Sequence, residues 1–344
     1  MVRLAIIGCG GISRMHAAYL HDLRDRVRVT VAVDLDLARA ATTAETLGAT
    51  LACTDYREAL EHCDAVLIAL PHHEHHPVGL DCLRAGKHVL MEKPLANTER
   101  QCLDLIEAAD AAGVTLMVAY CMRFHPLSMA LKRILDEGAY GVTFYVSVWT
   151  EQHTQYPADH WASSAEKLGG GQLFSHGCHY VDLLLWMLGD PIEGAHIGTN
   201  LGTPWMEREG TSEAIIRFAD GAIGHHGATW GARGTRLGYA LHAHTTEGML
   251  EADFGGGRLT LIRDGVETSL LETEPWSKHG MGEMCHFLRC IETGETPITD
   301  GYASLQGLRV IWRLYEAEAQ GRMADLSGLG LPDTSRRLPA DGQR

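Results

Sequence analysis

The chain has 344 residues, of which 45% are hydrophobic and 21% charged, and its 29 basic and 44 acidic residues give a net charge of −15. This composition is typical of a globular protein and excludes a disordered or collagen-like chain. The acidic balance argues against a nucleic-acid or anionic-membrane partner, because both require a basic face. At roughly 150 residues per domain, the length favours about two domains.

The first 120 residues alternate short apolar runs with helical segments. Strands are expected at 4–7, 27–33, 65–70, 88–91 and 115–120, and helices at 12–23, 37–47, 78–85 and 98–112. Asp55 and Thr98 open capping boxes, and Gly86 is expected to end the helix before it. Strands that alternate with helices of this length pair in parallel through right-handed crossovers. The pattern therefore predicts a Rossmann-type, doubly wound parallel sheet.

The pattern changes after a further helix at 126–138. Longer β-rich runs follow at 142–150, 212–218, 222–230, 237–245, 258–263 and 266–271, and Asp-Gly pairs separate two pairs of them. This predicts an open, mostly antiparallel sheet, with helices at 175–188, 282–293 and 304–319 covering one face. We expect domains at 1–122 and 123–325. The polar segment 326–344 is expected to be a flexible tail.

Cysteine usage and hydropathy indicate the compartment. The nine cysteines are odd in number, irregularly spaced and without a CxxC pair, which argues against a disulfide framework. No apolar run approaches the ~18–20 residues that span a bilayer, and the first apolar run is too short for a signal peptide. We expect a cytoplasmic protein.

The strongest local motif is Gly8-Cys9-Gly10-Gly11-Ile12-Ser13, between a strand and a helix. Gly8 permits a tight turn, Gly10 permits close approach of a pyrophosphate, and the small Ser13 permits close packing of helix on strand. The amides of Gly11 and Ile12 open the helix and face the phosphates. The hexapeptide predicts a dinucleotide site.

Asp34 ends the second strand, 21 positions after Ser13. A carboxylate there accepts both ribose hydroxyls and repels a 2′-phosphate. The nearest base is Arg39. We therefore predict NAD as the cofactor in preference to NADP. The alternative is that Asp34 only caps the next helix.

The histidine-rich segment 70–76 lacks the spacing of a metal site, since it contains no HExxH and no matching carboxylate or cysteine cluster. We expect it to form the turn after a sheet strand, where cofactors bind, and we predict no metal. Lys93 follows the strand 88–91 and precedes Pro94. At that strand end an ammonium can hold a substrate hydroxyl and stabilise the alkoxide as hydride leaves.

Several segments together resemble the glucose-fructose oxidoreductase/inositol dehydrogenase (Gfo/Idh/MocA) family. They are the loop 8–13, Pro71 and His75, the run 85–96 with Glu-Lys-Pro, Arg123-Phe124-x-Pro126, and the glycine triplet 169–171 followed by His179, Asp182 and Trp186. The resemblance covers about residues 2–320. It implies a Rossmann domain followed by an α/β domain with a large open sheet, through which members commonly oligomerise as homodimers or homotetramers.

The resemblance also implies roles for individual residues. Lys93 matches the catalytic, substrate-binding lysine, and His179 matches the histidine that exchanges the hydroxyl proton. The proline matched by Pro94 is often preceded by a cis bond. Residues implied beside the cofactor are Pro71, His72, His75, Glu92, Lys93 and Arg123.

One position departs from the family pattern. Many members have an aspartate one turn before the histidine, where this chain has Ser175. A serine can only hydrogen-bond, whereas a carboxylate would raise the histidine's basicity. The extra His176 either compensates as a second polar group or packs elsewhere. Trp161 either stacks on a pyranose ring or belongs to the core.

These features predict a hydride transfer between NAD and a ring secondary alcohol or ketone of a sugar, sugar derivative or cyclitol. Lys93 and His179 are the expected catalytic residues. Lys93, Trp161, Ser175, His176 and His179 are expected to bind the substrate. Two alternatives stay open: NAD-assisted glycoside cleavage through transient oxidation, and a sugar-sensing homologue without catalysis.

Overall fold

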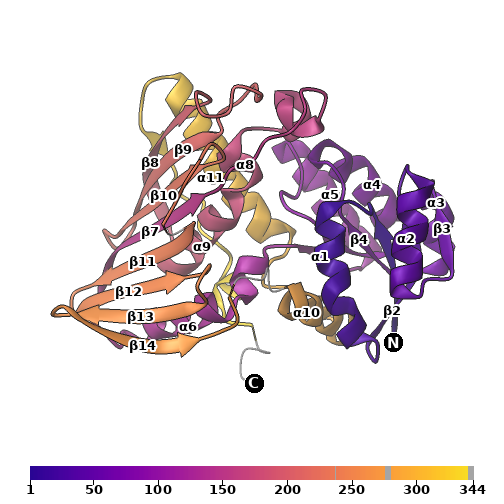
Figure 1. The fold of residues 1–344 in the computed structure, drawn as a ribbon, viewed down its shortest axis with the longest axis horizontal. Helices are drawn as coiled ribbons and strands as arrows, with labels where there is room; N and C mark the ends of the chain where they lie inside the picture. Colours follow the sequence, from indigo (N-terminus) through magenta and orange to yellow (C-terminus); the bar gives the residue numbers. More distant parts are fainter. Residues whose placement is uncertain (237, 276–279, 340–344) are drawn as a thin grey trace. The chain divides into compact units, whose positions relative to one another are not determined.

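The computed structural model describes residues 1–236, 238–275 and 280–339. The chain divides into two compact units (Figure 1): Met1–Cys121 with His279–Leu305, and Met122–Lys278 with Gln306–Arg344. The second unit begins at Met122, and the sequence placed the start of the second domain at Arg123. The segment 279–305, by contrast, was assigned from sequence to the second domain and groups with the first unit.

The first unit contains a parallel sheet, in which six strands are described. Their order is β3-β2-β1-β4-β5-β6, and every neighbouring pair is parallel. The strands are β1 (Val2–Ile7), β2 (Val27–Val33), β3 (Leu51–Cys53), β4 (Ala65–Ile68), β5 (His88–Met91) and β6 (Leu116–Val118). The strand order reverses between β1 and β4, and ligands of such sheets bind outside the strand ends at that point. The predicted doubly wound sheet is confirmed.

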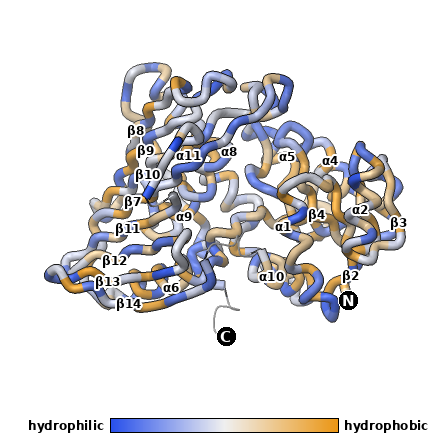
Figure 2. The backbone as a smooth tube through the Cα atoms, in the orientation of Figure 1, coloured by the Kyte–Doolittle hydropathy of each residue, from blue (hydrophilic) through white to orange (hydrophobic). Residues whose placement is uncertain are grey.

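Helices surround this sheet, and their ends follow local sequence signals. They are α1 (Gly11–Leu20), η1 (His21–Leu23), α2 (Leu37–Leu47), α3 (Tyr56–Ala59), η2 (Leu60–His62), α4 (His72–Arg84), α5 (Glu99–Ala112) and α10 (Gly280–Thr293). The predicted caps are confirmed, because the side chains of Asp55 and Thr98 accept backbone N–H groups of the first turn. Along α2 and α5, hydrophilic and hydrophobic residues alternate (Figure 2), as expected for helices with one buried face.

Two sequence expectations for these helices are wrong. The segment 70–76 does not form a turn, because α4 begins at His72 with Pro71 as its N-cap. Helix α10 does not cover the antiparallel sheet, since it packs against α1 in the first unit. A side chain at Gly280 would lie 2.3 Å from the Tyr19 ring, so the close approach of α10 to α1 requires glycine there. Neither outcome follows from hydrophobic periodicity.

The second unit contains an open sheet of nine described strands. Its order is β14-β13-β12-β11-β7-β10-β9-β8-β15, antiparallel throughout except for the parallel pair β7 and β10. The strands are β7 (Thr143–Glu151), β8 (Pro191–Thr199), β9 (Thr211–Phe218), β10 (Ile223–Thr229), β11 (Tyr239–Thr245), β12 (Gly248–Asp253), β13 (Arg258–Arg263), β14 (Val266–Glu272) and β15 (Ala324–Asp325). The predicted mostly antiparallel sheet is confirmed, although β8, β12 and β15 were not expected.

Helices of the second unit pack on one face of this sheet, with α9 on β10 and α6 on β12. The helical segments are η3 (Cys121–Phe124), α6 (Pro126–Glu137), η4 (Trp161–Ser163), α7 (Ala165–Leu168), α8 (Gln172–Ser175), α9 (Cys178–Leu188), α11 (Gly301–Ala319) and η5 (Asp333–Arg336). Every residue of α9 is buried. Within the described parts of the chain, no helix is both long and apolar enough to cross a membrane.

The structure differs from the predicted flexible tail over residues 326–339. Leu326, Leu331 and Ser335 are buried, and Arg336 forms an ion pair with Asp190. Although the composition of this segment is polar, these contacts hold it to the second unit. Residues 340–344 of the predicted tail lie outside the described residues.

Candidate functional site

The loop after β1 has the geometry of a phosphate cradle. Gly8 has φ = 95°, and a Cβ there would lie 2.3 Å from the Ala69 carbonyl oxygen. At Gly10 and Gly11 an added Cβ would meet no protein atom within 4 Å. Helix α1 has no side-chain cap at Gly10, so its first amides are available to an anion. Ser13 is buried and donates to the Gly10 carbonyl at 2.8 Å, which fixes the loop.

Asp34 lies beside this loop, as the sequence predicted for a ribose-binding carboxylate. Its Oδ2 accepts the Cys9 N–H at 2.9 Å, and its Oδ1 accepts the Asp36 N–H at 2.9 Å. Arg39 also reaches Oδ1, with its Nη2 at 2.9 Å. Helix α2 is capped by Asp36 rather than Asp34. The carboxylate of Asp34 is therefore held in place by backbone amides and is already paired with a cation.

Lys93 directly follows the buried residue Glu92 at the carboxyl end of β5. The Lys93–Pro94 peptide bond is cis, as the family resemblance implied. Glu92 is 7% exposed, and its Oε2 accepts the Lys93 N–H at 3.2 Å. Its other oxygen lies 2.8 Å from Nε2 of His16, a buried residue of α1. Sequence analysis missed His16, which carries no local signal for this contact.

The His16 ring links Glu92 to Tyr19. Its Nδ1 lies within hydrogen-bond distance of the Tyr19 hydroxyl. Burial, followed by the charge of Glu283, raises the pKa of Tyr19 well above its usual value, so the phenol is protonated and donates. The two ring nitrogens of His16 thus bridge the Tyr19 hydroxyl and the Glu92 carboxylate. The result is a buried hydrogen-bonded chain that ends at the backbone of Lys93.

His75, which the resemblance implied beside the cofactor, contacts two backbone carbonyl groups. Its Nδ1 lies 2.8 Å from the Pro94 carbonyl and its Nε2 lies 2.9 Å from the Leu70 carbonyl. The residue is fully buried, and burial lowers its pKa although the two carbonyl groups offset part of this effect. Both ring nitrogens are therefore used by the protein backbone. His75 holds the segment after Lys93 against the end of β4.

In the second unit, Ser175 and His179 do not share one continuous helix. Helix α8 ends at Ser175 and α9 begins at Cys178. Gly177 lies at the break, where a Cβ would be 2.6 Å from the Leu173 carbonyl oxygen. The single helix expected over 175–188 is therefore wrong, and the one-turn spacing between the two residues does not apply. Ser175, His176 and His179 are all buried.

The aromatic residues around Trp161 form a cluster. Trp161 packs against a core group of Ala162, Leu168, Met206 and Trp230 while staying partly exposed. The centroid of the His160 ring lies 5.5 Å from that of Trp161. His176 has aromatic neighbours of its own, because its ring centroid lies 5.3 Å from that of Tyr180 and 5.7 Å from that of Tyr239. Trp161 thus combines core packing with an exposed part that a ligand can reach.

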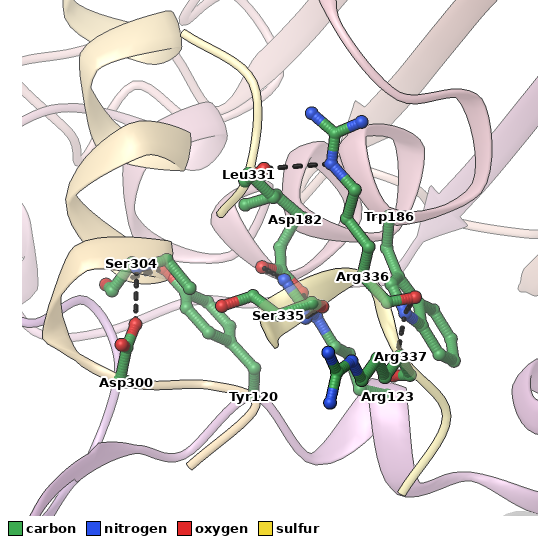
Figure 3. Close-up of polar contacts among 11 residues, drawn as sticks. Tyr120, Arg123, Asp182, Trp186, Asp300, Ser304, Leu331, Ser335, Arg336 and Arg337 are labelled. Carbon is green, nitrogen blue, oxygen red and sulfur yellow. Dashed lines mark hydrogen bonds and ion pairs between the residues drawn. The ribbon is translucent and has the colours of Figure 1, made fainter. Parts of the chain in front are cut away.

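Arg123, which the resemblance implied beside the cofactor, lies in a buried ion pair. Its side chain is 0% exposed and pairs with Asp182 on α9 through two bonds of 2.6 Å (Figure 3). Its remaining nitrogen donates to the Ser335 carbonyl in the C-terminal segment. Burial raises the pKa of the Asp182 carboxyl, and the Arg123 charge offsets part of that rise. Arg123 therefore links η3 to α9 and to the C-terminal segment of the second unit.

One group within the described ranges could hold a metal by its ligand types: His286, Cys290 and Glu295. Its atoms already have protein contacts, however. Both oxygens of Glu295 are bonded to Arg289 at 2.7 Å, and His286 Nε2 accepts the Ile298 N–H at 3.1 Å. A cation would have to compete with a guanidinium for the same carboxylate. The group is a helix-end hydrogen-bond network.

Two family models match the chain. Residues 2–120 match the oxidoreductase family with an NAD-binding Rossmann fold, and residues 128–251 match the GFO/IDH/MocA C-terminal domain. The chain belongs to the GFO/IDH/MocA family. This membership confirms the predicted fold class, the NAD cofactor and the dehydrogenase class.

Members of the GFO/IDH/MocA family with known activities are similar to this chain over most of its length. D-xylose 1-dehydrogenase (NADP(+)) 2 from Haloferax volcanii is 30% identical, over 85% of this chain and 90% of that protein. The scyllo-inositol 2-dehydrogenase (NAD(+)) of Bacillus subtilis is 26% identical, over 86% and 88%. A structure of levoglucosan dehydrogenase in complex with NADH has a TM-score of 0.85 at 20% identity, over 94% of this chain and 99% of that chain.

Proposed function

We propose that this dehydrogenase transfers a hydride between nicotinamide and a ring secondary alcohol or ketone of a sugar, sugar derivative or cyclitol. The relatives named above act on xylose and inositol, which supports this substrate class. The observation that supports it most is the position of Lys93. It follows β5, two strands from the phosphate cradle that follows β1, at the same edge of one sheet. Because neighbouring strands lie about 5 Å apart, the ends of β1 and β5 are separated by about 10 Å.

The residues present fit a bound dinucleotide, because the Gly10 position is open and the α1 amides have no side-chain cap. The nicotinamide, when bound, supplies the hydride acceptor. Lys93 holds the substrate hydroxyl and stabilises negative charge on its oxygen. His179 takes the hydroxyl proton as general base. Trp161 offers a face for the C–H side of the ring, and Ser175 and His176 complete the polar contacts of the substrate.

Oligomerisation through the open sheet is part of the same proposal. Ile197 and Ile215 lie on one face of the sheet, and they are 73% and 51% exposed. Phe144 on β7 is also 51% exposed. Apolar exposure of this kind supports a homodimer or homotetramer. Replacing Ile215 with Glu is expected to shift the sedimentation coefficient toward that of a monomer, and an unchanged value would remove this face from the interface.

The test is a panel of sugars, glycosides and cyclitols, scanned for reduction of NAD and repeated with Lys93→Met. We expect turnover to fall by at least three orders of magnitude while NADH binding, followed by nicotinamide fluorescence, stays within twofold. Lys87→Met is the matched control, because Lys87 lies at the opposite end of β5 and donates to the Cys63 carbonyl. Normal turnover in Lys93→Met would refute the mechanism. Glycoside cleavage without net NADH would favour the transient-oxidation alternative.

A further inference from the structure

The first turn of α8 is capped by a tyrosine from a distant helix. The N-cap of α8 is Gly171, which has no side chain to offer, and α8 has no local side-chain cap. The Tyr315 hydroxyl of α11 takes this role, because it accepts the N–H groups of Gly171 and Phe174, each at 3.2 Å. These amides are among the four that an α-helix leaves without an internal partner at its start. A residue 141 positions after Phe174 thus supplies the cap.

Glu209, which precedes β9, acts on the same turn. Its carboxylate accepts a hydrogen bond from the Tyr315 hydroxyl, and its backbone carbonyl accepts the Gln172 N–H at 2.8 Å. Burial, followed by the charge of Glu209, raises the pKa of Tyr315 well above its usual value, so the phenol stays protonated. A phenol oxygen both donates and accepts, and here it does both at once. Tyr315 and Glu209 together form a clamp on α8.

The glycines before α8 leave room for this clamp. A Cβ at Gly171 would lie 2.1 Å from the Glu209 carboxylate oxygen. A Cβ at Gly170 would lie 3.2 Å from the Tyr315 ring and 2.5 Å from the Cβ of Phe174. Any larger residue at either position would therefore displace a side chain that holds the first turn of α8.

The clamped turn leads directly to residues that are expected to bind the substrate. Ser175 is the last residue of α8, and its N–H donates to the Gly171 carbonyl at 2.9 Å. Gln172 is fully buried, and its side-chain Nε2 lies 3.4 Å from Nδ1 of His176. Ser175 and His176 are therefore each one contact away from a residue whose backbone the clamp holds.

We propose that Tyr315 and Glu209 are positioning residues for the substrate, because they hold α8 so that Ser175 and His176 meet the sugar or cyclitol. The inference rests on the proposed function. The clamp acts through α8 and not on the reacting atoms. His179 belongs to the next helix, α9, in which every residue is buried. Loss of the clamp should therefore weaken substrate binding more than it slows the chemical step.

The experiment compares the steady-state kinetics of Tyr315→Phe and the wild type, on the member of the sugar and cyclitol panel with the highest turnover. The variant keeps the ring but removes the acceptor of two α8 amides. We expect KM for the sugar to rise about tenfold, because an unsatisfied buried donor costs on the order of a factor of ten. The value of kcat should fall less than about threefold. A merely structural role predicts the opposite, since partial unfolding lowers the amount of active enzyme and thus kcat, at unchanged KM.

Two changes at Glu209 and one control test the specificity of the clamp. Glu209→Gln keeps an oxygen acceptor for the Tyr315 hydroxyl and should keep KM within about twofold of the wild type, whereas Glu209→Leu should raise KM as Tyr315→Phe does. Glu318→Gln is the matched control, because Glu318 lies on the same helix but bonds to His196 and to the Gly198 N–H on β8. Its KM should equal that of the wild type.

Hydrogen exchange provides a readout that needs no turnover. In Tyr315→Phe the amides of residues 171–175 should exchange about tenfold faster than in the wild type, while those of α9 keep the wild-type rate. Unchanged exchange in 171–175, a fall in kcat at constant KM, or the same rise in KM in Glu318→Gln would overturn the proposal. A wild type that oxidises no member of the panel, together with faster exchange in Tyr315→Phe, would refute the proposed substrate class and still support the hold on α8.

Discussion

The buried pair between Arg123 and Asp182 predicts a large loss of stability on a nearly isosteric change. The two side chains are 0% and 1% exposed and share two bonds of 2.6 Å. Replacing Asp182 with Asn keeps the shape of the side chain but removes its charge. The guanidinium of Arg123 then stays buried and faces a neutral amide oxygen in place of the carboxylate, beside the Ser335 carbonyl. We expect the free energy of unfolding to fall sharply.

The size of the loss follows from the geometry. With charge centres about 4 Å apart and an effective dielectric constant of about 20, the attraction is worth about 4 kcal/mol. Loss of one partner of a buried pair typically costs 3–5 kcal/mol, about the same value, because the other charge is left uncompensated. For a unit of this size, about 4 kcal/mol corresponds to a fall in Tm of about 8–16 °C.

Urea unfolding followed by circular dichroism measures the effect for Asp182→Asn, Arg123→Met and the double variant Arg123→Met/Asp182→Leu. The double variant should be more stable than the sum of the single losses predicts, since it leaves no unpaired charge. Glu193→Gln is the control, because its 2.8 Å pair with Arg217 is about half exposed and should contribute less than about 1 kcal/mol. A loss below about 1 kcal/mol for Asp182→Asn, or strict additivity, would refute this reasoning.

Three further predictions test the site and its pH dependence. Gly10→Ala should keep the Tm of the wild type but weaken NADH binding more than tenfold. Gly8→Ala should lower the Tm as well as weaken NADH binding, because an added Cβ would clash with backbone atoms at Gly8 but not at Gly10. Burial lowers the pKa of His226 to about 3. Unfolding raises this pKa to about 6.5, so the contribution of His226 to the free energy of unfolding is fully present above pH 6.5, and about 2 kcal/mol of it is lost at pH 5. In His226→Asn, the free energies of unfolding at pH 7 and pH 5 should differ by less than they do in the wild type. His75→Leu should lower kcat by about 10- to 100-fold through displacement of Lys93, with NADH affinity measured as the control.

Features of the fold that depend on neighbouring residues could be predicted from the sequence. The loop from Gly8 to Ser13 follows a strand and opens a helix, as its glycines require. The caps at Asp55 and Thr98 involve only the next three residues. The turn between β13 and β14 has positive φ at Asp264 and Gly265, which an Asp-Gly pair favours. In each case the signal and the structure it specifies lie within one turn of the chain.

Features that depend on distant partners could not be predicted. The sequence gives no sign that Arg123 meets Asp182, 59 positions later. At Gly177, where the helix is interrupted, an added Cβ would lie 2.6 Å from the Leu173 carbonyl oxygen and 2.9 Å from the His226 ring. The helical periodicity of 175–188 does not reveal this crowding.

The environment of Lys93 indicates how the first unit couples cofactor binding to chemistry. On one side, Glu92 is fixed by His16, which belongs to α1, the helix whose amides face the phosphate cradle. On the other side, the Pro94 carbonyl is fixed by His75 from α4. A displacement of α1 when the dinucleotide binds would therefore move Glu92 and, through its bond to the Lys93 N–H, the lysine itself. In the proposed mechanism, the buried His16 and His75 act on the reaction through the position of Lys93.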